Sequence, residues 1–478
     1  MVAGASKVFV LTVALVLAVW ASGHAVLNKR DPRGGTLWIF VIIILPVAGP
    51  FLYWIFGINR IHRWGVERAR TKEVAPTHLY PSEFLAETPH ACVDLDCLQD
   101  ISSRATGRPL LSGNRIEPLY EGNQVFPAML EAIGGARRSV TLSTYILDRD
   151  AVGIRIIDAL CAAANRGCHV RVLVDGFGTS RSALRMALKL RESGAGMSVF
   201  HPLLGWLPLR RPGLNLRNHR KILVVDGKVG FTGGINISGR HFFSRYKRLS
   251  PVRDIHFRVS GPVVSAMQEV FAEDWLVSTG ELIQGPDFFQ PPEAKGDICA
   301  RAVASGPDEN FERIYEVVMG AIRSANREIL IMTPYFIPTR ALTQSLRTAH
   351  LAGVDIRIIL PRHSDHPLVQ AASMAYLEEL LETGVSVYTA PPPFLHSKLM
   401  IVDRVWSLIG SANLDPRSFR LNFEFDLEVY SLDLAERLMA YGERTLQDSD
   451  RIDLKAFTSR PISVKLAEGV AKLFSPYL

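Results

Sequence analysis

The pattern His-x-Lys-x-x-x-x-Asp stands twice in this chain of 478 residues. The two copies are His219, Lys221 and Asp226, and His396, Lys398 and Asp403. Brought together, they suit displacement at a phosphodiester: one neutral imidazole attacks phosphorus, and the other, protonated, donates to the leaving oxygen. Both forms are accessible because the ordinary pKa of histidine, about 6.5, lies near neutrality. The lysines supply positive charge to the non-bridging oxygens, so this chemistry requires neither a metal nor another cofactor.

Each copy is followed at the same distance by a glycine pair or Gly-Ser and then by an asparagine. These runs are Gly233-Gly234-Ile235-Asn236 in the first half and Gly410-Ser411-Ala412-Asn413 in the second. Glycine lets the backbone approach closely, and we predict that Asn236, Ser411 and Asn413 bind the substrate. One motif alone would indicate a satisfied histidine and a solvated lysine at a strand end. Its duplication favours a catalytic site that the two halves share.

The residues from His219 to Val225 are rich in strand formers and end at Asp226-Gly227, which is typical of a hairpin turn. Because side chains alternate along a strand, His219 and Lys221 should point to one face and Asp226 to the other. The same parity holds in the second copy. We therefore expect the histidine and lysine to meet the substrate and the aspartate to be structural, although it belongs to the signature.

The elements that must position these residues also recur, at a spacing of about 180 residues, which is right for two similar domains. Predicted strands cover 139–145 and 167–174 in the first half, and 328–333 and 353–360 in the second. Alternating with helical stretches, they predict an α/β fold with mostly parallel or mixed sheets. The expected boundaries are 115–295 and 296–478 for the domains, 71–114 for a linker that wraps onto the first domain, and 1–70 for a membrane hairpin.

Two apolar runs near the N-terminus, Val8–Val26 and Thr36–Gly57, are each about long enough to span a bilayer. We expect two transmembrane helices, the second kinked by Pro46 and Pro50. A signal peptide is the alternative for the first run. The outer flanks carry more basic residues than the link between the runs, which places both ends in the cytoplasm. The residues compared are Lys7, Arg60, Arg63, Arg68, Arg70 and Lys72 against Lys29, Arg30 and Arg33.

Composition adds a few limits. The 48% apolar content is typical of folded domains rather than disorder. Five scattered cysteines lack the spacing of a zinc site or redox motif and favour a reduced compartment. The net charge of +7 suits an anionic membrane surface or a nucleic acid equally, and a solvated basic surface without a partner is the third alternative.

Together these features resemble the phospholipase D superfamily and, within it, the bacterial cardiolipin synthases. The resemblance rests on the two motifs, on the runs Asn215–Lys221 and Gly410–Tyr430, and on the paired apolar segments. It implies two αβα domains related by a pseudo-twofold axis, with one active site at their interface.

The resemblance also implies roles for residues. His219 would form a covalent phosphatidyl-histidine, His396 would act as acid and base, and Asp254 and Glu424 would orient the histidines. After Ile237 the chain reads Ser238-Gly239-Arg240-His241, where these synthases usually have Gly-Asp-Glu-Tyr. This departure bears on the head group or acceptor that the first half binds.

The expected function is a transferase that joins two phosphatidylglycerols into cardiolipin and releases glycerol. The expected place is the bacterial inner membrane, with a multi-pass anchor and the catalytic domains in the cytoplasm. A hydrolase that yields phosphatidic acid and another phosphatidyltransferase are alternatives. A nuclease is disfavoured, because a membrane hairpin has no use there, and no nucleic-acid partner is expected. The sequence leaves the oligomeric state open.

Three further apolar segments bear on membrane contact. The segments 201–211 and 391–395 precede the two histidines and either dip into a bilayer surface or pack between the domains. Near the C-terminus, apolar residues recur at helical spacing and either lie on the membrane or belong to the core. These residues are Val464, Ala467, Val470, Ala471 and Phe474.

Overall fold

The computed structural model describes residues 2–29, 32–57, 80–87, 95–179, 183–201, 216–242, 251–308 and 310–475. They belong to two units, Met1–Glu67 and Arg68–Leu478. Two predicted features lie outside the described residues, namely the basic flank between Arg60 and Lys72 and most of the apolar segment 201–211.

The N-terminal unit contains α1 (Val2–Asn28), α2 (Pro32–Ile44), α3 (Ala48–Leu52) and the π-helical turn η1 (Tyr53–Gly57). The second predicted span is therefore not one helix, because α2 ends two residues before Pro46. Proline lacks an N–H, and its ring clashes with the preceding turn, so the helix stops there. Among the residues described, we find no helix that combines the length and the apolar character needed to cross a membrane.

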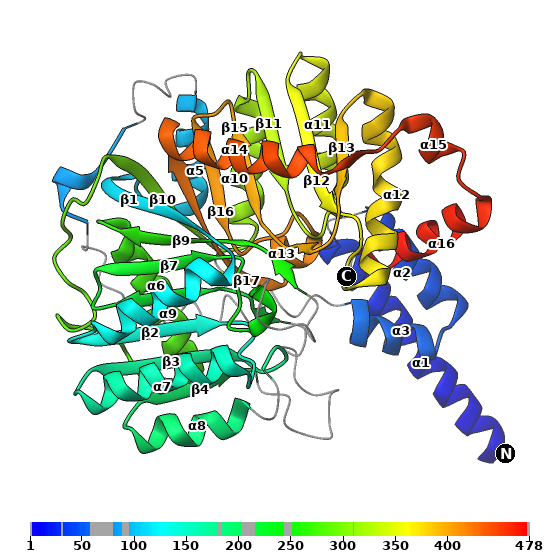
Figure 1. The fold of residues 1–478 in the computed structure, drawn as a ribbon. Coiled ribbons are helices and arrows are strands. Elements are labelled where there is room, and N and C mark those ends of the chain that lie inside the picture. The colour runs from blue at the N-terminus through cyan, green and yellow to red at the C-terminus, as the bar shows by residue number, and fades with distance from the viewer. Residues whose placement is uncertain are drawn as a thin grey trace. The chain divides into compact units, whose positions relative to one another are not determined.

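The larger unit is built on a sheet whose strands run in mirrored order from a central antiparallel pair, β1 (Leu111–Tyr120) and β10 (Ile298–Ser305) (Figure 1). In the first half β1 is followed outward by β9 (Ile255–Ser260), β7 (Val229–Gly233), β6 (Ile222–Val225), β2 (Ser139–Thr144), β3 (His169–Asp175) and β4 (Gly196–Phe200). In the second half β10 is followed by β17 (Asn422–Tyr430), β16 (Trp406–Gly410), β15 (Leu399–Val402), β11 (Glu328–Met332), β12 (Asp355–Pro361), β13 (Ser386–Ala390) and β18 (Asp450–Arg451). The strands predicted at 139–145, 167–174, 328–333 and 353–360 are confirmed.

Along this order of strands the parallel pairs lie in β2-β3-β4 and β11-β12-β13, and the strands nearer the centre are antiparallel. The sheet is therefore mixed rather than mostly parallel. The reason is the hairpin after each motif, since Asp226-Gly227 returns the chain from β6 to β7 beside it.

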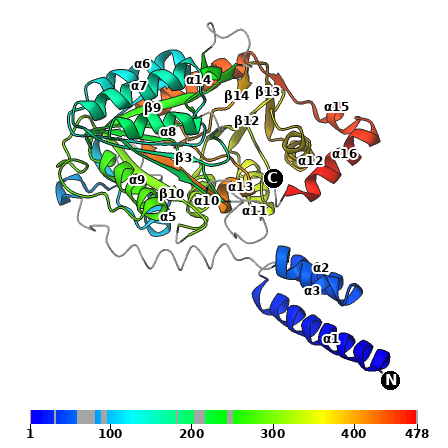
Figure 2. The same ribbon diagram turned by 90° about the horizontal axis from the view of Figure 1, so that it is seen from below.

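Helices cover both faces of this sheet (Figure 2). On one face, α9 (Val263–Thr279) and α14 (Leu432–Gln447) share an apolar core with strands of both halves. On the other, α6 (Glu121–Gly134), α7 (Ala151–Asn165) and α8 (Ala183–Glu192) cover the first half. The second half is covered by α10 (Arg313–Ser324), α11 (Arg340–Leu351) and α12 (Pro367–Thr383). The continuous core fixes the two motifs relative to each other.

The stretch predicted as a linker contains α5 (Asp96–Thr106), which packs on the second half rather than the first. Leu98 belongs to the apolar core around α10, and the Ser102 hydroxyl donates to Glu428 Oε1 at 2.8 Å. The prediction that this stretch wraps onto the first domain is therefore wrong for α5.

Candidate active site

Each motif reaches the site by first pairing with the opposite half. β5 (Arg217–Asn218) pairs in parallel with the start of β17, and His219 N–H donates to Phe423 O at 2.9 Å. In the same way β14 (Phe394–Leu395) pairs with β8 (Val252–Arg253), and His396 N–H donates to Arg253 O at 2.8 Å. The prediction that each motif lies on one strand is thus wrong at its start. The histidine and lysine lie in the link where the chain changes partner, just before β6 and β15.

The two histidines are held by carboxylates that cross between the halves. His219 Nδ1 lies 2.9 Å from Glu424 Oε2, and His396 Nδ1 lies 2.7 Å from Asp254 Oδ2. Both carboxylates are completely buried. A carboxylate at Nδ1 favours the tautomer with the proton there, which leaves Nε2 with its lone pair for reaction.

Burial and neighbouring cations determine the charge of these groups. Desolvation, followed by the charges of Lys221 and Lys398, lowers the pKa of His219 well below its usual value, and burial with the same lysines lowers the pKa of His396. Burial also lowers the pKa of Lys221 to about 7 and that of Lys398 to about 8, although the charges of Glu424 and Asp254 oppose this. Before an anion enters, both histidines are therefore neutral near pH 7.

The lysines lie beside the histidines that precede them. Lys221 Nζ donates to His219 O at 2.6 Å, and Lys398 Nζ donates to His396 O at 2.7 Å. Lys398 Nζ also lies 3.1 Å from both ring nitrogens of His396. The site thus presents two ammonium groups close to the two imidazoles, as expected for a pocket that receives an anionic phosphate.

The two carboxylates, Glu424 and Asp254, differ in the groups that surround them. Ser411 Oγ donates to Glu424 Oε2 at 2.6 Å, and Asn422 Nδ2 donates to Glu424 Oε1 at 3.1 Å. Burial raises the pKa of Asp254 to about 6 and also raises that of Glu424. The first half has Gly234 at the place of Ser411, where a Cβ would overlap the Asp254 carboxylate. Ser411, predicted to bind substrate, has its hydroxyl on Glu424 and therefore reaches His219 through that carboxylate.

The two asparagines are buried beside the motifs. Asn236 Oδ1 accepts from Ile146 N–H at 3.2 Å. Asn413 N–H donates to Ser418 Oγ at 3.1 Å, and Asn413 Oδ1 is buried with no hydrogen-bond partner within the described ranges. Their predicted contact with substrate stays a prediction.

The motif aspartates lie at the opposite end of β6 and β15 from the histidines. Asp226 accepts backbone hydrogen bonds of 2.8–3.1 Å from Arg137, Arg138 and Ser139. Asp403 accepts the equivalent bonds, at 2.8–2.9 Å, from Asn326, Arg327 and Glu328. They fasten each hairpin to the beginning of β2 or β11, which agrees with the structural role that parity indicates.

Two tyrosines complete the site and were missed from the sequence. The Tyr145 ring packs edge-on against His219 at 5.0 Å between centroids, and the Tyr335 ring does so against His396 at 6.5 Å. Tyr145 ends the first predicted strand of the first half, and Tyr335 lies two residues beyond the corresponding strand of the second half, so an aromatic residue close to the end of this strand was the available signal. In the described part of the chain, no group of three or more histidine, cysteine or acidic side chains is arranged to hold a metal ion.

Known proteins are similar to this chain in sequence and in fold. Residues 129–275 and 318–446 match the family model described as "Cardiolipin synthase, PLD-like domain", and residues 16–57 match a phospholipase D-nuclease N-terminal model. The chain is 34% identical over 461 residues to a cardiolipin synthase of Geobacillus sp. (strain WCH70), covering 95% of this chain and 90% of that one. It is 32% identical over 486 residues to the major cardiolipin synthase of Bacillus subtilis (strain 168), covering 99% and 98%.

The fold is similar to the crystal structure of a phosphatidylserine synthase from Haemophilus influenzae Rd KW20, with a TM-score of 0.63 at 15% identity. That likeness covers 80% of this chain and all of the other. Because it has the crossed histidine–carboxylate pairs and these matches along nearly its whole length, the chain belongs to the cardiolipin synthase family of phospholipase D-like enzymes.

Proposed function

We propose that the enzyme transfers a phosphatidyl group from one phosphatidylglycerol to a hydroxyl of another, giving cardiolipin and glycerol. The relatives reported above carry the name cardiolipin synthase, which gives the substrate class. The observation that supports the chemistry best is the pair of buried histidines, each with a carboxylate at Nδ1 and a lysine beside it.

In the first step His219 Nε2 attacks phosphorus, the bond from phosphorus to the glycerol oxygen breaks, and His396 gives its proton to that oxygen. We take His219 as the nucleophile because the resemblance to the family implies it. The lysines and the predicted contacts of Asn236 and Asn413 would hold the non-bridging oxygens. The arriving phosphate anion favours the protonated form of His396, since it offsets the positive charge of Lys221 and Lys398.

In the second step His396 removes the proton from a hydroxyl of the second lipid. That oxygen attacks phosphorus, and the bond from phosphorus to His219 Nε2 breaks, which restores both histidines to their starting states.

We propose further that the N-terminal unit attaches the enzyme to the bacterial inner membrane as a multi-pass anchor, with the catalytic unit in the cytoplasm. In this unit Val19, Leu27 and Ile43 expose 65%, 85% and 67% of their surface, more than a water-facing helix usually presents. We also propose the following division of the chain: a membrane hairpin at 1–70, a linker at 71–114, and two phospholipase D-like domains at 115–295 and 296–478.

The deciding experiment incubates the purified enzyme with phosphatidylglycerol vesicles without added metal and identifies lipid products and free glycerol by mass spectrometry. Cardiolipin with an equal amount of glycerol, absent with the His396→Ala variant, is the expected result. Phosphatidic acid alone would instead assign a hydrolase, and no turnover of lipid would refute the proposal.

A further inference from the structure

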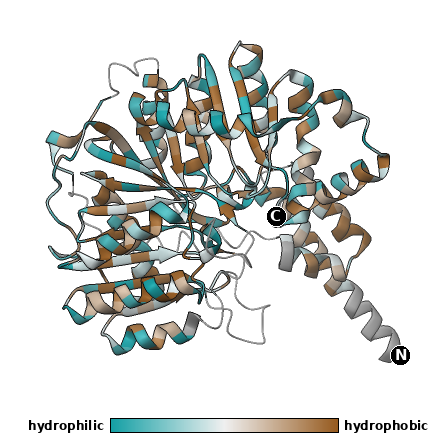
Figure 3. Ribbon diagram, viewed as in Figure 1, coloured by the Kyte–Doolittle hydropathy of each residue, from teal (hydrophilic) through white to brown (hydrophobic). Residues whose placement is uncertain are grey.

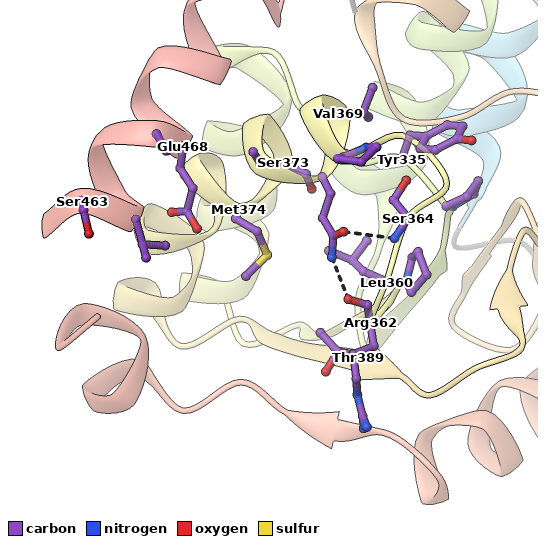
Figure 4. A pocket seen from close by; sticks show the side chains of 17 residues that line it. Tyr335, Leu360, Arg362, Ser364, Val369, Ser373, Met374, Thr389, Ser463 and Glu468 are labelled. Atoms are coloured by element: carbon purple, nitrogen blue, oxygen red, sulfur yellow. Dashed lines mark hydrogen bonds between the residues drawn. The ribbon is translucent and has the colours of Figure 1, made fainter. Parts of the chain in front are cut away.

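A cavity of about 510 Å³ opens between the end of β12, α12 and the C-terminal helix α16 (Ile462–Leu473) (Figure 4). Its apolar walls include Leu360, Val369, Met374, Val464 and Ala467. The volume lies within the range of roughly 300–1,000 Å³ that small-molecule sites occupy. Of the residues that contact the catalytic histidines, Tyr335 is the one that lines this cavity.

The rim of the cavity is fixed by hydrogen bonds. Gln370 Oε1 accepts from Ser364 N–H at 3.1 Å, and Gln370 Nε2 donates to Arg362 O at 2.6 Å. These bonds, drawn in Figure 4, tie the beginning of α12 to the loop that follows β12. The opening is therefore built into the fold.

Tyr335 connects the cavity to the active site. It lines the cavity, its ring packs against His396, and its hydroxyl donates to Asp365 Oδ1 at 2.6 Å. A ligand with its phosphate between the two histidines would thus have an apolar recess one side chain away from its head group.

The outer face of α16 is apolar as well. Ile462, Leu466, Val470 and Leu473 follow one another at helical spacing and are 78%, 67%, 51% and 76% exposed. We call these four residues the α16 stripe. Of the thirteen exposed large apolar side chains described between Arg68 and Leu478, six lie from Ile462 to Phe474, so the concentration is not chance scatter. Hydrophobic residues on this helix are coloured brown in Figure 3. A surface helix normally presents a polar outer face, which this one does not.

The sequence left two alternatives for the C-terminal segment, core or membrane surface. Ala471 is buried, whereas Val464, Val470 and Phe474 are 40%, 51% and 50% exposed, so the core does not account for the segment.

The charge of α16 favours an anionic surface. Its basic residues are Lys465 and Lys472, whose charge is held by neutral backbone carbonyls: Lys465 Nζ donates to Thr458 O at 2.5 Å, and Lys472 Nζ donates to Ala375 O at 3.3 Å. Its acidic residue, Glu468, is neutralised by Arg460 through bonds of 2.7 and 3.0 Å. An apolar stripe flanked by lysines is the pattern of a helix that lies in the interface of an anionic bilayer.

We propose that the cavity holds an acyl chain of the phospholipid whose phosphate lies between His219 and His396, while the α16 stripe lies in the surrounding lipid surface. This assignment rests on the proposed function. It gives the lipid a path from the bilayer, along α16 and past Tyr335, to the reacting phosphorus without full exposure of the chain to water.

The first test compares Met374→Trp, which fills the cavity, with Glu382→Trp, which places the same bulk on the exposed end of α12. Turnover of long-chain phosphatidylglycerol is measured against that of the dihexanoyl lipid. Met374→Trp should lower the long-chain to short-chain ratio of kcat/KM at least about tenfold, equivalent to one or two lost methylene contacts, and Glu382→Trp should leave it unchanged. Val464→Trp, from the opposite wall, should act as Met374→Trp does.

A loss that is equal for both lipids, or no change in the ratio with either cavity variant, would overturn the proposal while the transferase function stands. Absence of turnover in the unaltered enzyme would instead overturn the proposed function. These two failures are therefore distinguishable.

The second test uses full-length enzyme in vesicles containing phosphatidylglycerol with a diazirine at the end of one acyl chain. After illumination, mass spectrometry should place label on peptides of α12 and α16. Label on α16 should fall in a Leu466→Asp/Leu473→Asp variant. Label confined to other parts of the chain would contradict the assignment.

Discussion

His219 Nδ1 lies 2.9 Å from Glu424 Oε2, a carboxylate supplied by the other half of the molecule. The reciprocal pair, His396 and Asp254, is 2.7 Å apart. Neither half contains a complete histidine–acid pair, and each depends on the strand that its partner contributes. The two motifs therefore form one site, in which a substitution in one half acts on the histidine of the other.

Replacing Glu424 should affect the chemistry of His219 rather than that of His396. Glu424→Gln removes the anion that holds the Nδ1 proton, so kcat should fall by roughly 10²–10⁴-fold. If His219 is the nucleophile, labelled phosphatidyl-enzyme should form more slowly, which rapid quenching and gel separation would measure.

Asp254→Asn is the matched change on the other side. It acts on His396, so it should slow protonation of the leaving glycerol and activation of the acceptor. A donor with a leaving group that needs no proton should restore formation of the intermediate in this variant but not in Glu424→Gln. The opposite pattern would contradict the crossed pairing or the assignment of the nucleophile.

Deprotonation of the two lysines should lower kcat/KM at a pH that is unusually low for lysine. Because burial lowers the pKa of Lys221 to about 7 and that of Lys398 to about 8, both lose their protons far below the usual value near 10.4. The charge that receives the phosphate is lost with them, so kcat/KM should decline as pH rises through 7 to 8. A profile of kcat/KM from pH 5 to 10 would measure this limb, and Lys398→Arg should move it to higher pH.

The same lysines affect stability in the opposite direction. Their pKa is lower in the folded chain than in the unfolded one, so between about pH 7 and 10 the unfolded chain binds more protons. Their contribution to the free energy of unfolding should therefore increase with pH while activity falls. A melting temperature that fell together with kcat/KM over pH 7 to 8 would attribute the alkaline limb to unfolding instead.

Ser411 should lower the pKa of Glu424. Its hydroxyl donates to the carboxylate at 2.6 Å and lowers the pKa of Glu424 against the effect of burial. In Ser411→Ala the pKa of Glu424 should rise, so the acidic limb of the kcat profile should move to higher pH. We expect kcat to fall about tenfold, the effect of about 1.4 kcal/mol. An unchanged acidic limb would mean that Ser411 does not act through Glu424.

Introducing a serine at Gly234, the position in the first half that corresponds to Ser411, should reduce activity. Gly234→Ser places a Cβ where the Asp254 carboxylate lies, so it should displace the partner of His396 and reduce activity more than Ser411→Ala does. Circular dichroism of the purified variant would separate this local effect from unfolding, and full activity would show that the first half can accommodate a side chain there.

The duplicated motifs predicted a shared site because the spacing of their residues and its recurrence in the second half are visible in a sequence. The repeated strands at 139–145 and 328–333 were predictable for the same reason. The crossing was not, because it depends on β5 and β14 pairing with β17 and β8 through only two residues each. Pairing of such short segments is set by the tertiary fold and leaves no periodicity to detect.

Ser411 and Tyr335 show a second limit. Ser411 was recognised in the repeated run and Tyr335 was missed, and the partners of both depend on which side chains the folded sheet brings within reach. Ser411 meets Glu424 because β16 and β17 are neighbours, and Tyr335 meets His396 because β11 lies beside β15. From the sequence, Pro46 predicted only a kink in one helix. The structure shows that the helix ends there and that α2 and α3 are separate helices.

The motif aspartates should matter for stability more than for chemistry. Asp226→Asn removes the charge that three backbone N–H groups share, which should lower the free energy of unfolding by about 1–3 kcal/mol. Asp403→Asn should do the same in the second half. For the fraction that remains folded, kcat should stay within a few fold of the unaltered enzyme, whereas His219→Ala should abolish turnover with little change in melting temperature. Thermal melts paired with kcat measurements would check this. A large fall in kcat in a fully folded Asp226→Asn enzyme would contradict this. It would show that the aspartate influences His219 through β6, because among the described contacts no hydrogen bond joins the two side chains.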